Sequence, residues 1–298
     1  FQLGGEVAKN TAQGQIALAG SAQIITAPAF SARVQTSQAN LSLRDAQDSG
    51  QAGWQLTQST PIDITWAQGK LLFRAGAVQL NAPKSLRVGA QRNLTLEWDE
   101  SRITPGNGGV RQAQTAGRVR GIPVQWVEAI SGTTLADMGL VGELLFDANW
   151  TAQIDAQNLR LNAAITRRSG DLRLLSESLR SDKRQESASA GIREASITLT
   201  GNNQNLRLDA LWDSANAGSA KASLSSSLAR QGDAWVWPTS APLQGKVQAH
   251  MPGLGVWSAL APTGWRVNGS LVADASLTGT RNNPQILGKV QITELSIR

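Results

Sequence analysis

Apolar residues recur at every second position over much of this chain. Clear examples are Leu94, Leu96 and Trp98, then Leu159, Leu161, Ala163 and Ile165, and finally Leu271, Ala273, Ala275 and Leu277. Successive side chains of a β-strand point to opposite faces of the sheet, so this period of two places the apolar side chains on one face. The pattern therefore predicts antiparallel sheet with one apolar face and one polar face.

Turn signals separate the alternating stretches at short intervals, among them Asp48-Ser-Gly, Gly201-Asn-Asn and Asn282-Asn-Pro. At about 10–12 residues for each strand and its turn, the chain would form roughly 20–25 strands. A single open sheet of that size twists and curls. We therefore expect an all-β fold in which one long, curled, antiparallel-rich sheet forms an elongated apolar trough.

Two stretches depart from the period of two. Residues 123–130 and 254–260 place apolar side chains three and four positions apart, which predicts one or two short helical insertions. A ten-residue strand follows each stretch, at 142–151 and at 269–278, and the two strands share Gly, Leu, Asp, Ala and Thr at matching positions. We expect residues 1–298 to form one elongated, repetitive β structure, with sub-boundaries near 105–120 and 250–265 and a polar loop over 176–190.

The composition removes most enzyme chemistry. The chain has no cysteine or tyrosine, and its single histidine, His250, lies outside any nucleophile motif. Asp99 and Glu100 are adjacent, so on a strand their carboxylates point to opposite faces. We expect neither catalysis nor a cofactor or metal. The net charge of +6 weakly favours anionic partners, but no aromatic residue interleaves the arginines of 160–193, so we expect no nucleic acid.

Residues 264–290, Gly-Trp-Arg-Val-Asn-Gly-Ser-Leu-Val-Ala-Asp-Ala-Ser-Leu-Thr-Gly-Thr-Arg-Asn-Asn-Pro-Gln-Ile-Leu-Gly-Lys-Val, resemble the C-terminal part of the TamB family. Residues 166–172 (Thr-Arg-Arg-Ser-Gly-Asp-Leu) and 121–126 (Gly-Ile-Pro-Val-Gln-Trp) are similar to further parts of that family. The resemblance runs from about residue 117 to the end, whereas residues 1–116 share only the alternation and the turns. TamB is the inner-membrane subunit of the bacterial translocation and assembly module and belongs to the AsmA-like group.

The resemblance implies a curled sheet of the β-taco type with an apolar inside. It implies the periplasm of a Gram-negative bacterium, with anchorage to the inner membrane by an N-terminal segment absent from this chain. The implied partner is an outer-membrane barrel protein of the TamA type. The implied roles are phospholipid movement between the membranes and the assembly of some outer-membrane proteins, and the family offers no catalytic residues to transfer.

Our leading hypothesis is a non-enzymatic protein whose apolar groove conducts phospholipid between the inner and outer membranes and contacts its acyl chains. The alternation selects twelve residues as the groove lining: Leu94, Leu96, Trp98, Leu144, Phe146, Trp150, Leu159, Leu161, Leu206, Leu208, Leu271 and Leu277. This rests on the period of two, and a hairpin folded over the sheet would cover the same face equally well.

Two alternatives remain open on the residues. In the first, an exposed sheet edge acts as a scaffold or chaperone that templates nascent outer-membrane strands by β-augmentation. In the second, the chain is a secreted β-solenoid, either an adhesin or a glycan-active protein. A solenoid would show a short repeat of about 20–25 residues, and glycan cleavage would need a carboxylate pair in a cleft; the sequence shows neither.

Overall fold

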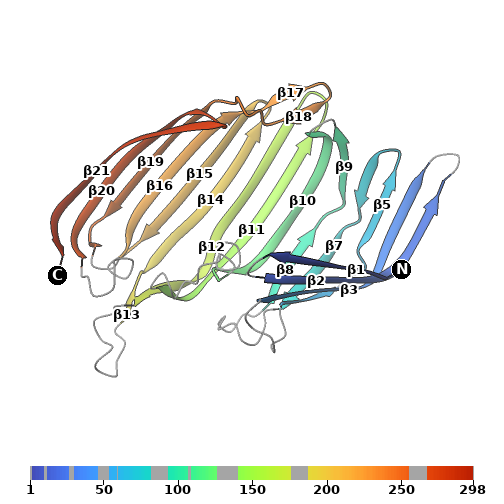
Figure 1. Cartoon of the computed structure of the whole chain (residues 1–298), viewed down its shortest axis with the longest axis horizontal. Coiled ribbons are helices and arrows are strands. Elements are labelled where there is room, and N and C mark those ends of the chain that lie inside the picture. Colours follow the sequence, from blue (N-terminus) through green and yellow to red (C-terminus); the bar gives the residue numbers. More distant parts are fainter. Residues whose placement is uncertain are drawn as a thin grey trace. The chain divides into compact units, whose positions relative to one another are not determined.

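The computed structural model describes residues 2–9, 12–26, 30–45, 54–58, 60–81, 93–106, 109–125, 140–175, 187–254 and 267–297. These residues are nearly all in β-strands, and the strands form one large antiparallel sheet that is not closed (Figure 1). The predicted all-β, antiparallel-rich fold is therefore confirmed. The alternation of apolar and polar residues is the local cause, because it suits a strand that exposes its two faces to different surroundings.

The described residues contain 21 strands. In chain order they are β1 (Gln2–Lys9), β2 (Ala12–Ile25), β3 (Ser31–Asp45), β4 (Trp54–Gln58), β5 (Asp63–Ala67), β6 (Lys70–Phe73), β7 (Gly76–Asn81), β8 (Asn93–Trp98), β9 (Ser101–Gly106), β10 (Gly109–Pro123), β11 (Leu140–Ile154), β12 (Leu159–Leu175), β13 (Ser187–Ser189), β14 (Ile192–Asn202), β15 (Asn205–Ser214), β16 (Gly218–Ser227), β17 (Ala229–Gln231), β18 (Ala234–Val236), β19 (Leu243–Met251), β20 (Val267–Thr280) and β21 (Asn283–Ile297).

The chain divides into two compact units, which we describe separately. Unit 1 comprises residues 1–122, 147–163 and 230–236, and unit 2 comprises residues 123–146, 164–229 and 237–298. One unit boundary, between 122 and 123, lies just beyond the predicted sub-boundary at 105–120. Whether the whole chain forms one elongated structure stays a prediction.

In unit 1 two long strands, β3 and β10, are joined through two sets of short strands. One set runs β3–β5–β6–β9–β10, and it uses Ser31–Gln35 of β3 and the first half of β10. The other runs β3–β4–β7–β8–β10, and it uses Ser42–Leu43 of β3 and Gly117–Arg120 of β10. The long strands therefore keep the two short sets in one continuous sheet.

In unit 2 the strands follow one another in a simple antiparallel order. Strands β14, β15, β16, β19, β20 and β21 pair in that sequence (Figure 1, yellow to red). The register between β15 and β16 continues without a shift from Asn205↔Ser227 to Ser214↔Gly218. This unbroken register aligns equivalent side chains of six strands into rows that cross the sheet.

The two predicted helical insertions lie mostly outside the described residues. Pro123 ends β10 and is followed by a turn at Val124 and Gln125, and Leu254 is the last described residue before 267. The predicted polar loop 176–190 is described only at its end, where 187–189 form β13 and pair with Arg173–Leu175 of β12. Residues 176–186 are outside the described residues.

The two matching ten-residue segments have the same local backbone feature. They lie on β11 and β20, and each begins with a glycine of positive φ, 144° at Gly142 and 125° at Gly269. At both glycines a Cβ would collide with a backbone carbonyl oxygen of the neighbouring strand, that of Asp171 or Thr293. The register of β20 and β21 shifts between Asn268 and Ser270, which marks a β-bulge at Gly269.

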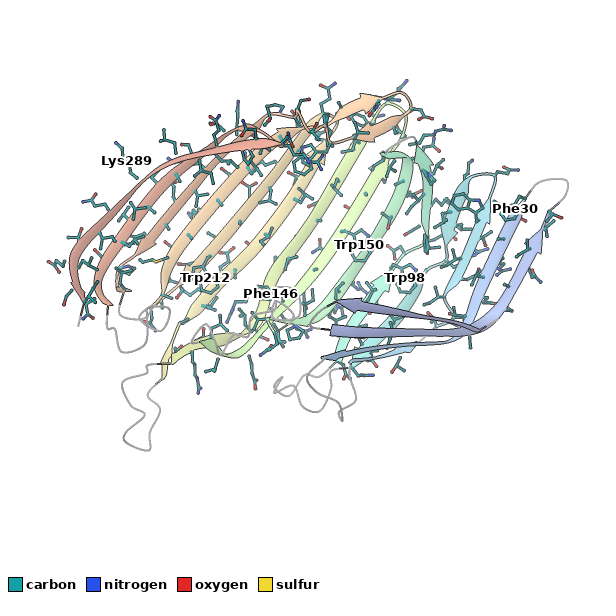
Figure 2. The ribbon with its side chains drawn as sticks, in the orientation of Figure 1. Phe30, Trp98, Phe146, Trp150, Trp212 and Lys289 are labelled. Atoms are coloured by element: carbon teal, nitrogen blue, oxygen red, sulfur yellow. The ribbon has the colours of Figure 1, made fainter. Side chains whose placement is uncertain are left out.

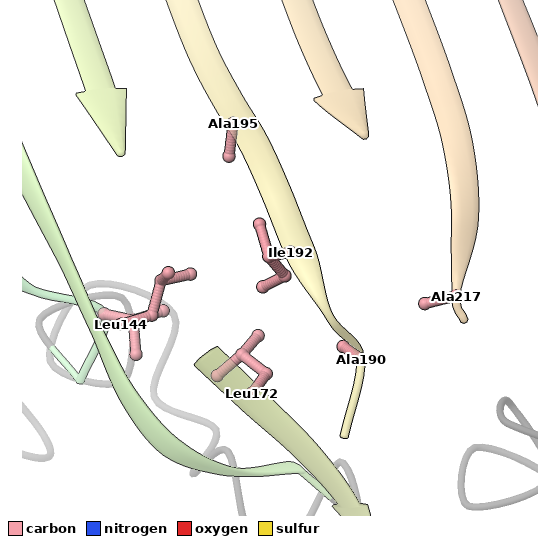
Figure 3. Close-up of a cluster of buried hydrophobic side chains, with 7 residues drawn as sticks. Leu144, Leu172, Ala190, Ile192, Ala195 and Ala217 are labelled. Carbon is pink, nitrogen blue, oxygen red and sulfur yellow. The ribbon is translucent and has the colours of Figure 1, made fainter. Parts of the chain in front are cut away.

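A compact apolar core stabilises one end of unit 2. Seven buried side chains form it: Val124, Leu144, Leu172, Ala190, Ile192, Ala195 and Ala217. Figure 3 shows Leu144, Leu172 and Ile192 gathered between β11, β12 and β14. The partly buried side chains of Phe146 and Trp212 pack against this core. Hydrogen bonds from Ala190 N to Leu172 O (2.8 Å) and from Ala217 N to Ser214 Oγ (2.8 Å) fix the backbone around it.

A salt bridge between Arg33 and Asp63 joins β3 to β5 in unit 1. Arg33 Nε donates to Asp63 Oδ1 at 3.0 Å, and the Asp63 residue is 7% exposed. The hydrogen bond from Arg33 lowers the pKa of Asp63, and it outweighs the effect of burial, which raises that pKa. Thr36 and Ile62 complete the junction, with Thr36 N donating to Ile62 O at 2.9 Å.

The lowered pKa of Asp63 makes its contribution to stability depend on pH. A carboxyl group whose pKa is depressed by folding stabilises the fold above its unfolded pKa of about 3.9, and this contribution disappears as the pH falls through the folded pKa. Asp63→Asn should lower the free energy of unfolding by about 1 kcal/mol at neutral pH, a modest value because solvent screens the half-exposed Arg33. Urea denaturation at pH 7 and at about pH 2.5 should show that difference only at the higher pH. An equal difference at both pH values would contradict the assignment.

Candidate functional site: the apolar face of the sheet

The six strands of unit 2 align apolar side chains in three rows that cross the sheet. The rows are Leu199–Leu208–Leu224–Gly245–Leu277–Ile286, Ile197–Ala210–Ala222–Val247–Ala275–Gly288 and Ala195–Trp212–Ala220–Ala249–Ala273–Val290. We call these rows the unit-2 face. Leu206 precedes Leu208 by two residues and Leu271 precedes Ala273 by two, so both lie on the same face. Four predicted lining residues, Leu206, Leu208, Leu271 and Leu277, therefore lie together on this face.

The unit-2 face is partly open to solvent. Among its bulky side chains, Ile197 is 46% exposed, Val247 45%, Ile286 76% and Val290 65%. Leu208, Leu271 and Leu277 are half-buried by their neighbours along and across the strands. A contiguous exposed apolar surface is unusual in a protein that acts alone, so this face is a candidate binding surface for an apolar ligand.

The opposite face of the same strands is polar and carries paired charges. Arg207 donates to Asp209 at 2.6 Å, and Lys246 Nζ lies 3.1 Å from Asp274 Oδ2. These hydrogen bonds lower the pKa of Asp209 and of Asp274. A shallow, open depression of about 390 Å³ lies on this face, and Thr198, Ser223 and Gln248 are among the residues that line it.

Unit 1 has an apolar face of its own, which the predicted residues Leu94, Leu96 and Trp98 help to form. Leu94 lies opposite Leu80, and Leu96 lies between Val78 and Val119. In the other set of short strands, Trp66, Leu71 and Ile103 lie in one row. Leu94, Val78 and Leu80 are 5–7% exposed, so this part of unit 1 is covered more completely than the unit-2 face.

Two tryptophans of unit 1 lie over glycines on the same face. Trp98 packs over Gly76, where a Cβ would lie 2.5 Å from the ring, and Trp150 packs over Gly117. Figure 2 labels the two tryptophans. Both indole N–H groups are satisfied by the sheet itself: Trp98 Nε1 donates to Arg74 O at 2.8 Å and Trp150 Nε1 to Thr115 Oγ1 at 3.2 Å. The glycines leave room for rings that lie flat on the sheet, which smooths the apolar face.

The remaining predicted lining residues are less accessible. Leu144 is 1% exposed within the core of unit 2, and Phe146 packs against that core. On β12, Leu159 is 4% exposed and Leu161 is half-buried. The structure thus divides the twelve residues between the partly open face and the covered core.

The prediction overlooked the strands that make up the centre of the unit-2 face. Ala220, Ala222 and Leu224 of β16 and Gly245, Val247 and Ala249 of β19 supply two residues to every row. These residues do alternate with polar ones in the sequence. The pattern is weak, because alanine and glycine are also common in turns and on polar faces and so do not mark an apolar face. Ile286 and Val290 of β21 alternate with Leu287 and Lys289, so one apolar residue on the wrong face obscures that strand's pattern.

In the part of the chain that the structure describes, no helix combines the length and the apolarity that a membrane crossing requires. Comparisons with protein-family models, with curated proteins and with solved structures found no match for this chain.

Proposed function

We propose that the chain is a non-enzymatic protein of the cell envelope whose apolar face binds the acyl chains of phospholipids and conducts them between the inner and outer membranes. The observation that carries this proposal is the unit-2 face, three apolar rows that continue across six strands and are partly exposed to solvent, for example at Ile197, Val247 and Ile286. The resemblance of residues 264–290 to the TamB family supports it. The proposal includes what that resemblance implies, a periplasmic location and an outer-membrane barrel partner of the TamA type.

The binding energy that the unit-2 face offers a phospholipid suits movement of the lipid along the face better than its storage at one place. Burial of acyl chains against such a face stabilises the complex by about 0.8 kcal/mol per CH₂, so several methylenes give useful retention. Each row offers neighbouring strands with similar side chains, for example Leu208 and Leu224, which lie directly opposite each other. A lipid can therefore move from strand to strand between similar sites, because no single deep site holds it.

Mass spectrometry of an organic extract tests this function. The detergent-free chain, purified from a Gram-negative host, should carry phospholipid at a reproducible ratio to protein. A folded, β-rich preparation whose extract contains no phospholipid would overturn the proposal.

A second candidate function rests on the last strand. β21 pairs with β20 along its length, and no further strand lies beside it in the described part of the chain (Figure 1). Its side chains are exposed almost throughout, with Leu287 at 82%. An exposed apolar edge strand can accept another strand by β-augmentation, which is the chemistry of a scaffold for nascent outer-membrane proteins.

Site-specific photocrosslinking separates the two candidates. A crosslinker at Leu287 should capture unfolded barrel strands if the edge is a scaffold, whereas one at Leu208 should capture lipid if the unit-2 face is a conduit. Capture at one position alone selects the corresponding function.

A further inference from the structure

One rim of the unit-2 face is built by a short segment that packs against the β20–β21 turn. Arg281 N donates to Ala241 O at 2.9 Å, and Asn282 N donates to Thr239 O at 3.0 Å. Pro242 forms a β-bridge with Thr280 next to these bonds. Residues 237–242 are thereby fixed to the turn, so that side chains from both segments share one place on the rim.

Trp237 lies at the edge of the apolar rows. Its indole Nε1 donates to Ser226 Oγ at 2.9 Å. Ser226 lies opposite Leu206 on β15 and Leu243 on β19, two residues from Leu224, so its hydroxyl is on the unit-2 face. The indole is 39% exposed. An exposed indole between an apolar surface and water matches the position that tryptophan prefers at a lipid–water interface.

Arg281 stacks on that indole. Its guanidinium carbon lies 4.6 Å from the centre of the Trp237 ring, and its Nη1 donates to Trp237 O. Among the described residues, Arg281 forms no ion pair, whereas Arg193, Arg207 and Lys246 of the same unit each pair with an aspartate. In the described part of the chain, the rim therefore holds an exposed positive charge that is oriented by an aromatic ring and that no carboxylate pairs with.

We infer that Arg281 and Trp237 form a headgroup site that binds the phosphate of a glycerophospholipid whose acyl chains lie on the unit-2 face. This inference rests on the proposed function and names the site where the polar end of the lipid is held. A guanidinium has five N–H donors in a planar arrangement that matches phosphate oxygens, and Trp237 O occupies one of them.

The spacing between the rim and the apolar rows suits such a lipid. Leu277, the first bulky apolar residue of β20 inward from the turn, precedes Arg281 by four residues, about 13 Å along an extended strand. An arginine side chain and a glycerophosphate group together bridge that span. The row next to the rim contains Ser226 and the buried Leu243, so the glycerol region would meet small or covered side chains there.

Calorimetric titration of the full chain with three probes tests the inference. The probes are dioctanoyl phosphatidylglycerol, dioctanoylglycerol, which has the same chains without phosphate, and glycerol 3-phosphate, which has no chains. We expect the chain to bind the phospholipid about tenfold more tightly than the diacylglycerol, because the phosphate accepts charged hydrogen bonds from Arg281. Glycerol 3-phosphate, which has no acyl chains, should not bind measurably. Arg281→Gln should remove the preference and leave diacylglycerol binding unchanged. Trp237→Ala, which removes the stacked ring, should reduce the preference.

Arg207→Gln is the matched control, because Arg207 is an exposed arginine on the polar face of the same unit. This variant should keep the full preference. If Arg281→Gln also keeps it while both lipids bind, the headgroup site is wrong and the proposed function stands. Equally tight binding of glycerol 3-phosphate would overturn the headgroup site as well, since it would show a free-anion site. If neither lipid binds the unaltered chain, the proposed function itself fails.

Discussion

Leu277→Arg is expected to reduce co-purifying phospholipid at least tenfold, whereas Thr278→Arg on the next residue leaves the amount unchanged. Leu277 lies in an apolar row between Gly245 and Ile286, so an arginine there places a charge where acyl chains would bind. Desolvation of that charge by a bound chain costs more than the roughly 1.4 kcal/mol that corresponds to a factor of ten in binding. Phospholipid extracted from equal amounts of each variant and quantified by mass spectrometry measures the effect.

The two variants make the same chemical change on one strand and differ only in the face that receives it. Thr278 points to the polar face, where it lies opposite Gln285. Circular dichroism should show the same β content in both. Leu208→Arg, in the same row on β15, should repeat the loss. Unchanged lipid in a folded Leu277→Arg chain would sink the assignment of the unit-2 face as the lipid-binding surface.

Leu144→Ala should lower the free energy of unfolding by about 3 kcal/mol, the largest effect on stability that we expect from one substitution. Leu144 is 1% exposed and packs with Leu172 and Ile192, which come from two other strands. Removal of its side chain loses apolar burial and leaves a cavity, because the surrounding backbone is held by hydrogen bonds such as Val124 N to Leu144 O (2.9 Å). Urea denaturation monitored by circular dichroism provides the measurement.

Leu287→Ala is the matched control for this stability prediction. Leu287 is 82% exposed on β21, so the same substitution should change the free energy of unfolding by less than about 0.5 kcal/mol. Similar losses for the two variants would show that Leu144 is not part of a closely packed core.

The sequence predicted the two-faced strands well because the period of two is a local property. Leu206 and Leu208, or Leu271 and Leu277, needed only their own neighbours to be placed on one face. Burial is not local in this way. Leu144 and Leu271 have the same kind of alternating pattern, but Leu144 is covered by residues of β12 and β14, far along the chain, whereas Leu271 remains half-exposed.

The strand order and the contact between Arg281 and Trp237 at the rim also could not be predicted from local sequence patterns. The two sets of short strands between β3 and β10 depend on which half of each long strand pairs with which partner. The stacking of Arg281 on Trp237 joins residues 44 positions apart in the sequence. No local pattern links the two residues, so only the pairing of the segments that contain them brings the two together.

The rows of the unit-2 face receive one residue from each strand, and this makes the length of the surface easy to change in evolution. A hairpin added at the end of such a sheet extends every row by two positions, about 9–10 Å, while the existing strands keep their partners. The new strands need only the same simple alternation. The matched segments on β11 and β20, with their corresponding glycines of positive φ, are what duplication of such a building block would leave in one chain. The length of the surface and its side-chain chemistry can thus change independently. The number of strands sets the length, and the residues along each strand set the chemistry.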